Sequence, residues 1–222
     1  MKRTFLFLLA ALLPLLALPQ GIITRPTKKP TQTTTPTQKP PKKRNVINGH
    51  EYVDLGLSVK WATTNVGASS PSDYGYYFAW GETSTKSAYT EANSRTYKTS
   101  MGDIAGNAAY DAARANWGGT WRLPTEAECE ELVNQCTWTW TTQGGHNGCR
   151  VTGKNGNSIF LPAAGLRDGL SLYGVGEEGL YWSSTPGGVD TEDAYRLYFL
   201  SSGHYVGWDI RYRGRSVRPV SE

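Results

Sequence analysis

The stretch from residue 181 to residue 220 is a succession of short strand-like runs separated by turn residues. Aromatic and β-branched residues fill the runs 181–184, 194–200 and 215–220, and the run 205–212 adds a further candidate strand. Glycine, serine, proline and aspartate lie between the runs, as expected for turns. A chain that ends in this way is predicted to build a sheet from short strands with surface connections.

Two helices are predicted upstream of these strands. An alanine-rich segment at 105–116 predicts a short helix, which Gly118 and Gly119 end. Residues 121–136, WRLPTEAECEELVNQC, carry the stronger signal, because Thr125 and Glu128 have capping-box spacing. Acidic residues in the first turns also suit the positive end of the helix dipole. The apolar face predicted for this helix consists of Ala127, Cys129, Leu132, Val133 and Cys136.

The segment 51–66 predicts two short strands around Gly56. Its apolar residues recur with period two, which places them on one face of a sheet. They are Val53, Leu55, Leu57, Val59 and Trp61. Residues 67–81 then combine a turn with a short aromatic strand, and the polar residues 82–103 predict a long surface loop.

The middle of the chain predicts further strands at 137–142, 148–152 and 158–162. Glycines separate the first two, and Asn155-Gly156 is a hairpin signal before the third. A glycine-rich loop is expected at 163–179. Two helices with short antiparallel strands and long loops together predict an α+β fold.

The N-terminus predicts export. A basic start and an apolar run at 5–18 are typical of a secretory signal peptide, here assigned to residues 1–20. Residues 21–44 are almost only Thr, Pro, Lys, Gln and Arg, and predict an extended linker without a core of its own. One folded domain is expected at 45–222. The expected location is therefore the periplasm, the cell surface or the extracellular space, with membrane contact only through the uncleaved signal.

The distribution of charge argues against nucleic-acid binding. The whole chain carries a formal charge of +4, but nine of its 23 Lys and Arg residues precede residue 45. All 19 acidic residues follow that point, so 14 basic and 19 acidic residues remain and the predicted domain carries about −5. The basic footprint that a nucleic-acid surface needs is absent from it.

Six motifs, in the right order along 50–222, resemble a known family. They are YVDLGLSVKWAT at 52–63, YFAWGE at 77–82, WRLPTEAE at 121–128, FLPAAG at 160–165, YWSS at 181–184 and SVRPV at 216–220. With them the chain resembles the Fibrobacter succinogenes major paralogous domain, common in exported proteins of gut Bacteroidetes. The resemblance implies a C-type-lectin-like fold, in which the first and last strands pair and a long loop region binds ligand.

Two functional subclasses of that fold fit less well. WRLPTEAE and the final RGRSVRP are similar to formylglycine-generating enzymes, whose activity rests on cysteines in the C-terminal part of the domain. This chain has no cysteine after Cys149, so we assign no catalytic residue and expect no enzyme. Calcium-dependent lectins carry a Glu-Pro-Asn or Gln-Pro-Asp triplet and a Trp-Asn-Asp; here only Trp208-Asp209 is similar, and no triplet exists.

The candidate ligand-binding residues come from the aromatic and arginine-rich C-terminal region. Tyr, Trp and Arg dominate binding hot spots, and their flat faces and bidentate donors suit sugars and carboxylates. The candidates are Arg196, Tyr198, His204, Tyr205, Trp208, Asp209, Arg211, Tyr212 and Arg213. The alternative interpretation is that part of this region is core.

Metal and thiol chemistry have weaker signals. The acidic group Asp190, Glu192 and Asp193 offers oxygen ligands for Ca²⁺, but no spaced calcium motif surrounds it. A solvated turn is the favoured interpretation, so we assign no cofactor and no metal residue. Cys129 and Cys136 lie too far apart along one helix for a disulfide. A bridge from Cys136 to Cys149 is open, with buried free thiols as the favoured interpretation.

The sequence therefore predicts an exported, non-enzymatic module that recognises a glycan or a surface protein through loops between about residues 190 and 213. Two alternatives stay open. One is a binding protein whose C-terminal codons are diversified by a retroelement. The other is an enzyme of the formylglycine-generating or carbohydrate-active type.

Overall fold

The computed structural model describes residues 45–188 and 191–222. The predicted signal peptide and linker lie outside the described residues. The elements, in chain order, are β1 (Val46–Ile47), β2 (His50–Val53), β3 (Lys60–Ala62), a 3₁₀ turn at Glu91–Asn93, α1 (Ala112–Trp117), α2 (Glu126–Gln135), β4 (Thr137–Gln143), β5 (His146–Thr152), β6 (Ser158–Pro162), β7 (Leu166–Asp168), β8 (Ser171–Tyr173), β9 (Glu178–Pro186), β10 (Asp193–Leu200), β11 (Gly203–Ile210) and β12 (Val220–Ser221). The described chain is thus α+β and rich in strands, which confirms the coarse fold class.

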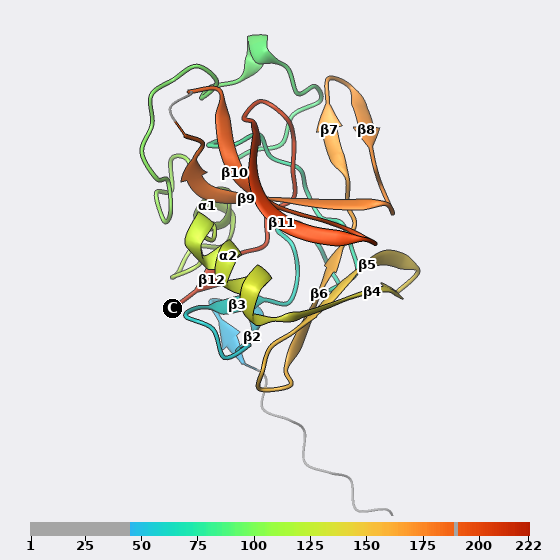
Figure 1. Ribbon diagram of the computed structural model, residues 1–222. Helices are drawn as coiled ribbons and strands as arrows, with labels where there is room; N and C mark the ends of the chain where they lie inside the picture. Colours follow the sequence, from blue (N-terminus) through green and yellow to red (C-terminus); the bar gives the residue numbers. More distant parts are fainter. Residues whose placement is uncertain (1–44, 189–190) are drawn as a thin grey trace, which may run out of the picture. The chain divides into compact units, whose positions relative to one another are not determined.

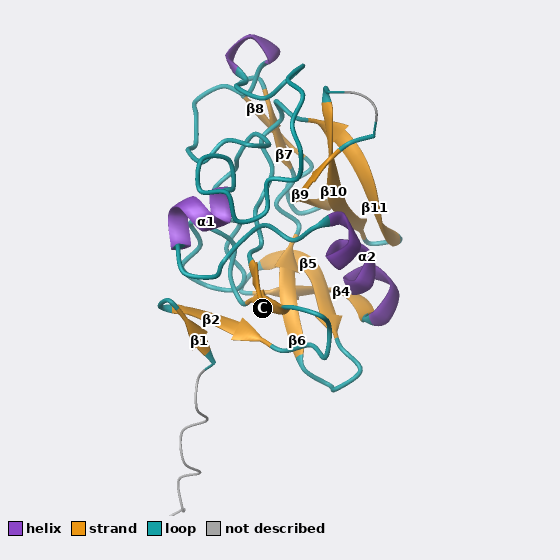
Figure 2. Cartoon of the chain, turned by 90° about the vertical axis from the view of Figure 1, so that its left-hand side faces the viewer, coloured by secondary structure: helices purple, strands orange, loops and turns teal. Residues whose placement is uncertain are grey.

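The strands form four small sheets, with the orders β1-β2-β3-β12, β11-β10-β9, β4-β5-β6 and β7-β8 (Figure 1). Every strand pair within them is antiparallel. Figure 2 shows α2 beside both the β9–β11 sheet and the β4–β6 sheet, and its buried residues share one core with them. Within the part of the chain that is described, no helix is long and apolar enough to cross a membrane.

The two ends of the described domain meet in one sheet. Val220 of β12 lies opposite Trp61 of β3, and Ser221 lies opposite Lys60. The backbone of Arg122, just before α2, bonds to Val220 from the other side. The last residues of the chain therefore complete the core rather than trail from it.

The segment 51–66 contains the two short strands predicted around Gly56, and its period-two pattern correctly predicts burial. All five of its apolar residues lie in, or pack against, one hydrophobic cluster with α2, β5 and β10. The regular strands stop at Val53 and resume at Lys60. Between them the Asp54 carboxylate accepts a hydrogen bond from the Gly56 N–H at 2.7 Å, and Gly56 has a φ of +75°. A local turn at Gly56 thus separates the two short strands, as predicted, and both strands are shorter than the segment 51–66.

Helix α2 begins at the predicted cap. The Thr125 hydroxyl accepts from Glu128 N at 3.2 Å, and the Glu128 carboxylate accepts from Thr125 N at 2.8 Å. Arg122 donates to the same carboxylate with both terminal nitrogens, at 2.8 and 2.7 Å. Four of the five predicted apolar residues contact the core, but Ala127 is exposed.

We expect Thr125→Ala to lower the free energy of unfolding by about 1 kcal/mol, because it leaves an N-terminal N–H of α2 without its acceptor. Chemical denaturation measures the change. Thr125→Ser keeps the hydroxyl and should stay close to the wild type. Equal losses in both variants would show that the methyl group, and not the cap, matters.

Helix α1 is shorter than predicted, and Asp111 explains why. Its buried carboxylate accepts from Ala113 N at 2.8 Å and Arg114 N at 3.0 Å, which fixes the first turn at Ala112. The same carboxylate accepts from Gly106 N and Leu123 N, both outside the helix. The predicted start at 105 is wrong because these bonds hold the preceding alanines in turns.

One loop prediction and two strand predictions also need correction. The glycine-rich segment 163–179 contains the β7–β8 hairpin, closed by a two-residue connection in which Gly169 has a φ of +57°. The predicted aromatic strand in 67–81 is reduced to one bridge between Phe78 and Arg215. The segment predicted as a strand at 215–220 makes only isolated bridges before β12. In the last two cases long-range contacts, rather than local pattern, decide the outcome.

Candidate functional site

The C-terminal sheet presents two different faces. The face toward α2 carries the buried Leu197 and Phe199 of β10, which belong to the core with Leu132 of the helix. Cross-strand register places Tyr198 opposite Tyr205 and Arg196 opposite Gly207. Directly opposite residues of an antiparallel pair project from the same face. The other face therefore gathers four predicted residues: Arg196, Tyr198, Tyr205 and Asp209.

These residues lie on strands, which corrects the predicted location on loops. Arg196 and Tyr198 belong to β10, and the predicted residues from His204 to Asp209 belong to β11. Arg211, Tyr212 and Arg213 follow in the turn after β11. Asp190, at the start of the predicted binding region, lies outside the described residues. A surface on paired strands is more rigid than a loop and holds side chains in fixed register.

Asp209 is the centre of an arginine cluster. Its carboxylate pairs with Arg196 Nε at 3.4 Å, with Arg213 Nη1 at 3.2 Å and with Arg215 Nη2. Burial by itself would raise the pKa of Asp209, but Arg215, a backbone hydrogen bond from Ile210 and the other two arginines outweigh it. The pKa is held below its ordinary value, so the group is a carboxylate at neutral pH.

The arginines of this cluster outnumber the carboxylates. Arg213 also pairs with Asp168 of β7 at 2.9 Å, so two carboxylates serve three guanidinium groups. Burial lowers the pKa of Arg215 to about 10, despite the opposing effect of Asp209. Arg196 Nη1 and Arg215 Nη1 have no hydrogen-bond partner among the described residues. The cluster is therefore electropositive, and these two unpaired donors are buried within it.

Two tyrosines cover Arg196. Its guanidinium carbon lies 4.8 Å from the ring centroid of Tyr198 and 5.5 Å from that of Tyr205. The Tyr198 hydroxyl donates to Glu178 Oε2 at 2.8 Å; burial and this carboxylate raise the pKa of Tyr198 to about 12. The side chain of Tyr205 is 49 % exposed. The result is an accessible aromatic ring fixed beside cations, an arrangement that can stack on a ligand and donate to its oxygens.

Four predicted residues lie outside this cluster. Arg211 is buried over Trp80 and donates to the backbone carbonyls of Asp193, Thr96 and Thr99, so its role is structural. His204 stacks on Trp138 with centroids 4.6 Å apart. Tyr212 packs edge-on against Tyr97. Trp208 is 63 % exposed, but it projects from the opposite face of the sheet, beside Tyr195.

Arg215 and Asp168 are functional candidates that sequence reasoning missed. Arg215 is buried, with its guanidinium carbon 4.9 Å from the Trp182 ring centroid. Its Nη2 forms an ion pair with the Asp209 carboxylate. Asp168 comes from the β7–β8 hairpin, 41 positions before Asp209 in the sequence. The one sequence signal that could have identified Arg215 is the density of arginines in RYRGRSVRP. That signal led to the choice of Arg213, but nothing local shows that Arg215 belongs to the same cluster.

The cysteines are placed as buried free thiols. Cys129 and Cys149 are buried and Cys136 is half-buried, with no bridge between them. Burial raises the pKa of Cys149 to about 12 and raises that of Cys129 as well. A nucleophilic thiol needs the opposite shift, because the thiolate is the reactive form. Among residues 45–188 and 191–222, no three His, Cys, Asp or Glu side chains gather closely enough to hold a metal ion.

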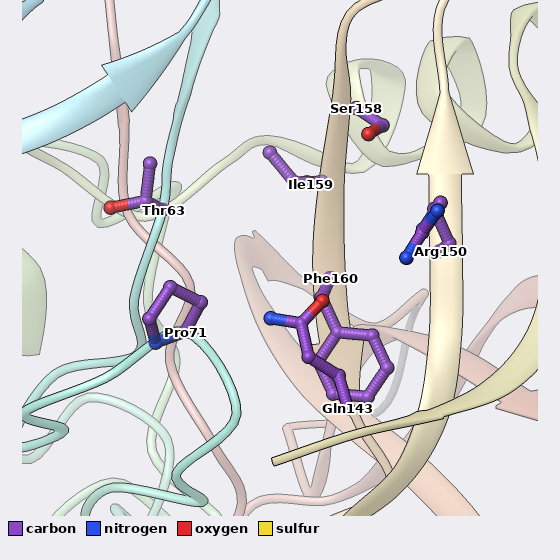
Figure 3. A pocket seen from close by; sticks show the side chains of 7 residues that line it. All are labelled: Thr63, Pro71, Gln143, Arg150, Ser158, Ile159 and Phe160. Carbon is purple, nitrogen blue, oxygen red and sulfur yellow. The ribbon is translucent and has the colours of Figure 1, made fainter. Parts of the chain in front are cut away.

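A pocket of about 180 Å³ lies elsewhere, between the loop after β3 and the β4–β6 sheet. Figure 3 shows Thr63 and Pro71 facing Ile159 and Phe160 across it, with Gln143 in front of the Phe160 ring and Arg150 at its side. Its walls are mostly neutral. It offers shape but few converging polar groups, so it is a weaker candidate than the Asp209 cluster.

Comparison of the chain with protein-family models, with curated proteins and with solved structures finds no match. The family resemblance and its functional implications accordingly stay predictions.

Proposed function

We propose that the chain is an exported, non-enzymatic binding module with a C-type-lectin-like architecture. The sheet β1-β2-β3-β12 supports this architecture, because it joins the first strands of the domain to the last one, as that fold does. The long polar segment before α1 and the two helices support it further. The proposed ligand is a glycan or a protein on a cell or host surface.

The observation that carries the binding proposal is the exposed Tyr205 ring on Arg196, next to Asp209 and Arg213. Arg196 and Asp209 are fixed by register and ion pairs, so they need no ordering when a ligand arrives. Preorganised aromatic and arginine groups give affinity at low entropic cost. The proposed contact face is therefore the β10–β11 face that carries Arg196, Tyr198, Tyr205, Asp209 and Arg213, which we call the arginine face.

The test is binding of the full chain to a broad glycan and surface-protein array, with Ca²⁺ and with chelator. Tyr205→Ala should weaken a specific hit at least tenfold while the melting temperature changes little, because the ring is half exposed. Trp208→Ala is the matched control, since it removes an exposed aromatic residue from the opposite face of the same strand.

Loss of binding in Trp208→Ala, with Tyr205→Ala unaffected, would move the site to the α2 side of the sheet. Absence of any specific hit would count against the binding class. Equal binding with Ca²⁺ and with chelator is the result expected for a site without metal ligands.

A further inference from the structure

A second hollow lies beside the β7–β8 hairpin, outside the arginine face. Its volume is about 310 Å³, and it is lined by Tyr76, Tyr77 and Tyr89, by Lys86 and Arg167, and by small residues between them. This size is at the lower end of the range of roughly 300–1,000 Å³ for small-molecule sites. One monosaccharide unit, rather than an extended ligand, suits it.

The floor of this pocket is preformed. The Tyr77 hydroxyl donates to the Ala164 carbonyl at 2.6 Å, and the Tyr89 hydroxyl donates to the Tyr77 carbonyl at 2.5 Å. The backbones of Tyr89 and Gly169 exchange two hydrogen bonds of 2.8 Å, which fasten the polar loop to the hairpin. Both rings are buried and held at their polar ends. A ligand would meet a fixed surface and would not have to order it.

Arg167 is the uncompensated charge in the pocket. The other cation, Lys86, lies 2.8 Å from the Glu82 carboxylate and also donates to the Asn93 carbonyl. The adjacent acidic residue on β7, Asp168, forms its ion pair with Arg213. The guanidinium of Arg167 lies over the Tyr77 ring, 5.4 Å from its centroid, and makes no ion pair or side-chain hydrogen bond within the described residues. The unpaired N–H donors of its planar guanidinium can form two parallel hydrogen bonds to a carboxylate, which also carries the opposite charge.

Tyr76 supplies a flat wall beside this cation. Its ring rests directly on the backbone of Gly67, where an added Cβ would lie 2.4 Å from the ring, so only a glycine leaves room for it there. The side chain is nevertheless 53 % exposed, so ring surface remains accessible. An aromatic face of this kind packs against the apolar side of a sugar ring.

We propose that this pocket binds a sugar that carries a carboxylate, with the carboxylate on Arg167 and the sugar ring against Tyr76. Lys86 and Glu82 neutralise each other, which leaves Arg167 to select for the acid. The inference does not rest on the function proposed for the arginine face, with which the pocket shares no residue.

The experiment is a chemical-shift titration of the full chain with D-glucuronate and D-galacturonate, and with D-glucose and D-galactose as neutral counterparts. A uronate should saturate the protein, and the matching neutral sugar should bind at least tenfold more weakly. Arg167→Met should reduce uronate affinity at least tenfold, to the level of the neutral sugar. Arg167→Lys should fall between them, because it keeps the charge but loses the bidentate fork. Arg150→Met, which removes an exposed arginine of β5, is the control and should bind as the wild type.

Three results would overturn the proposal. They are equal affinity for uronate and neutral sugar, unchanged affinity in a folded Arg167→Met variant, and acetate binding as tightly as glucuronate, which would show anion binding without sugar recognition. If Arg167→Met fails to fold, the Tyr76→Ala variant tests the proposal instead. We expect it to lose at least fivefold in uronate affinity. Unchanged uronate affinity in this variant would refute the stacking role of Tyr76. Array binding through Tyr205 can succeed or fail independently of these outcomes.

Discussion

Replacing Asp209 by asparagine should lower the free energy of unfolding by about 3 kcal/mol, since removing one partner of a buried ion pair strands the charges that remain. Three arginines converge on this carboxylate, and Arg215 is fully buried. The asparagine keeps the volume of the side chain, so the loss reports charge rather than a cavity. Urea denaturation with an unchanged m value is the measurement.

Asp168→Asn is the matched control. It also removes a carboxylate from Arg213, but that pair is more exposed, with the Asp168 side chain 34 % accessible against 17 % for Asp209. Exposed pairs contribute about 0–1 kcal/mol. Losses of equal size in the two variants would contradict the view that Asp209 alone balances the buried cations.

The effect of Asp209 should also depend on pH in a defined direction. Its pKa in the folded protein lies below the ordinary value of 3.8, so the carboxylate stabilises the fold at every pH above that value. As the pH falls below 3.8 and through the folded pKa, protonation removes this contribution. The difference in unfolding free energy between the wild type and Asp209→Asn should therefore be constant near neutrality and shrink below about pH 4. A difference that grew with acid would refute the assigned shift.

The features that sequence reasoning predicted correctly are those encoded within a few residues. Thr125 and Glu128 meet across one helical turn, and Asn155-Gly156 closes a hairpin between adjacent strands, so spacing alone identifies both. Asp111 shows the limit, because its carboxylate gathers N–H groups as far apart as Gly106 and Leu123, and no local pattern predicts that convergence.

The candidate site was predictable in composition but not in geometry. Residue type alone marked Arg196, Tyr205 and Asp209 as suited to binding. Which face each one occupies depends on the register of β10 against β11, and a shift of one residue would exchange the exposed and buried sets. Arg211 and Arg213 look alike in the sequence, yet the first is tied to backbone carbonyls in the interior and the second reaches the surface.

The second large effect is expected for Arg218→Met, which should lower the free energy of unfolding by roughly 3–5 kcal/mol, because it leaves buried acceptors unpaired. Arg218 is fully buried and donates to Asn65 Oδ1 at 2.8 Å, to the Ala62 carbonyl at 3.0 Å and to the Phe160 carbonyl at 3.0 Å. Burial lowers its pKa to about 10, so it stays charged at neutral pH. Methionine fills much of the space but leaves three buried acceptors unpaired, each of which costs about 1–3 kcal/mol.

These three bonds explain why the effect should spread beyond one residue. They join the segment before β12 to the end of β3 and to β6, so the same guanidinium links the sheet that contains β3 and β12 to the β4–β6 sheet. At about 2–4 °C per kcal/mol for a domain of this size, the melting temperature should fall by roughly 10 °C. Arg150→Met removes an exposed arginine from β5 and should leave it within about 2 °C, since surface substitutions rarely exceed ±0.5 kcal/mol. A small loss in Arg218→Met would mean that water replaces the guanidinium at these carbonyls, and that the backbone pairing of β12 with β3 and with Arg122 is enough to hold the closing strand.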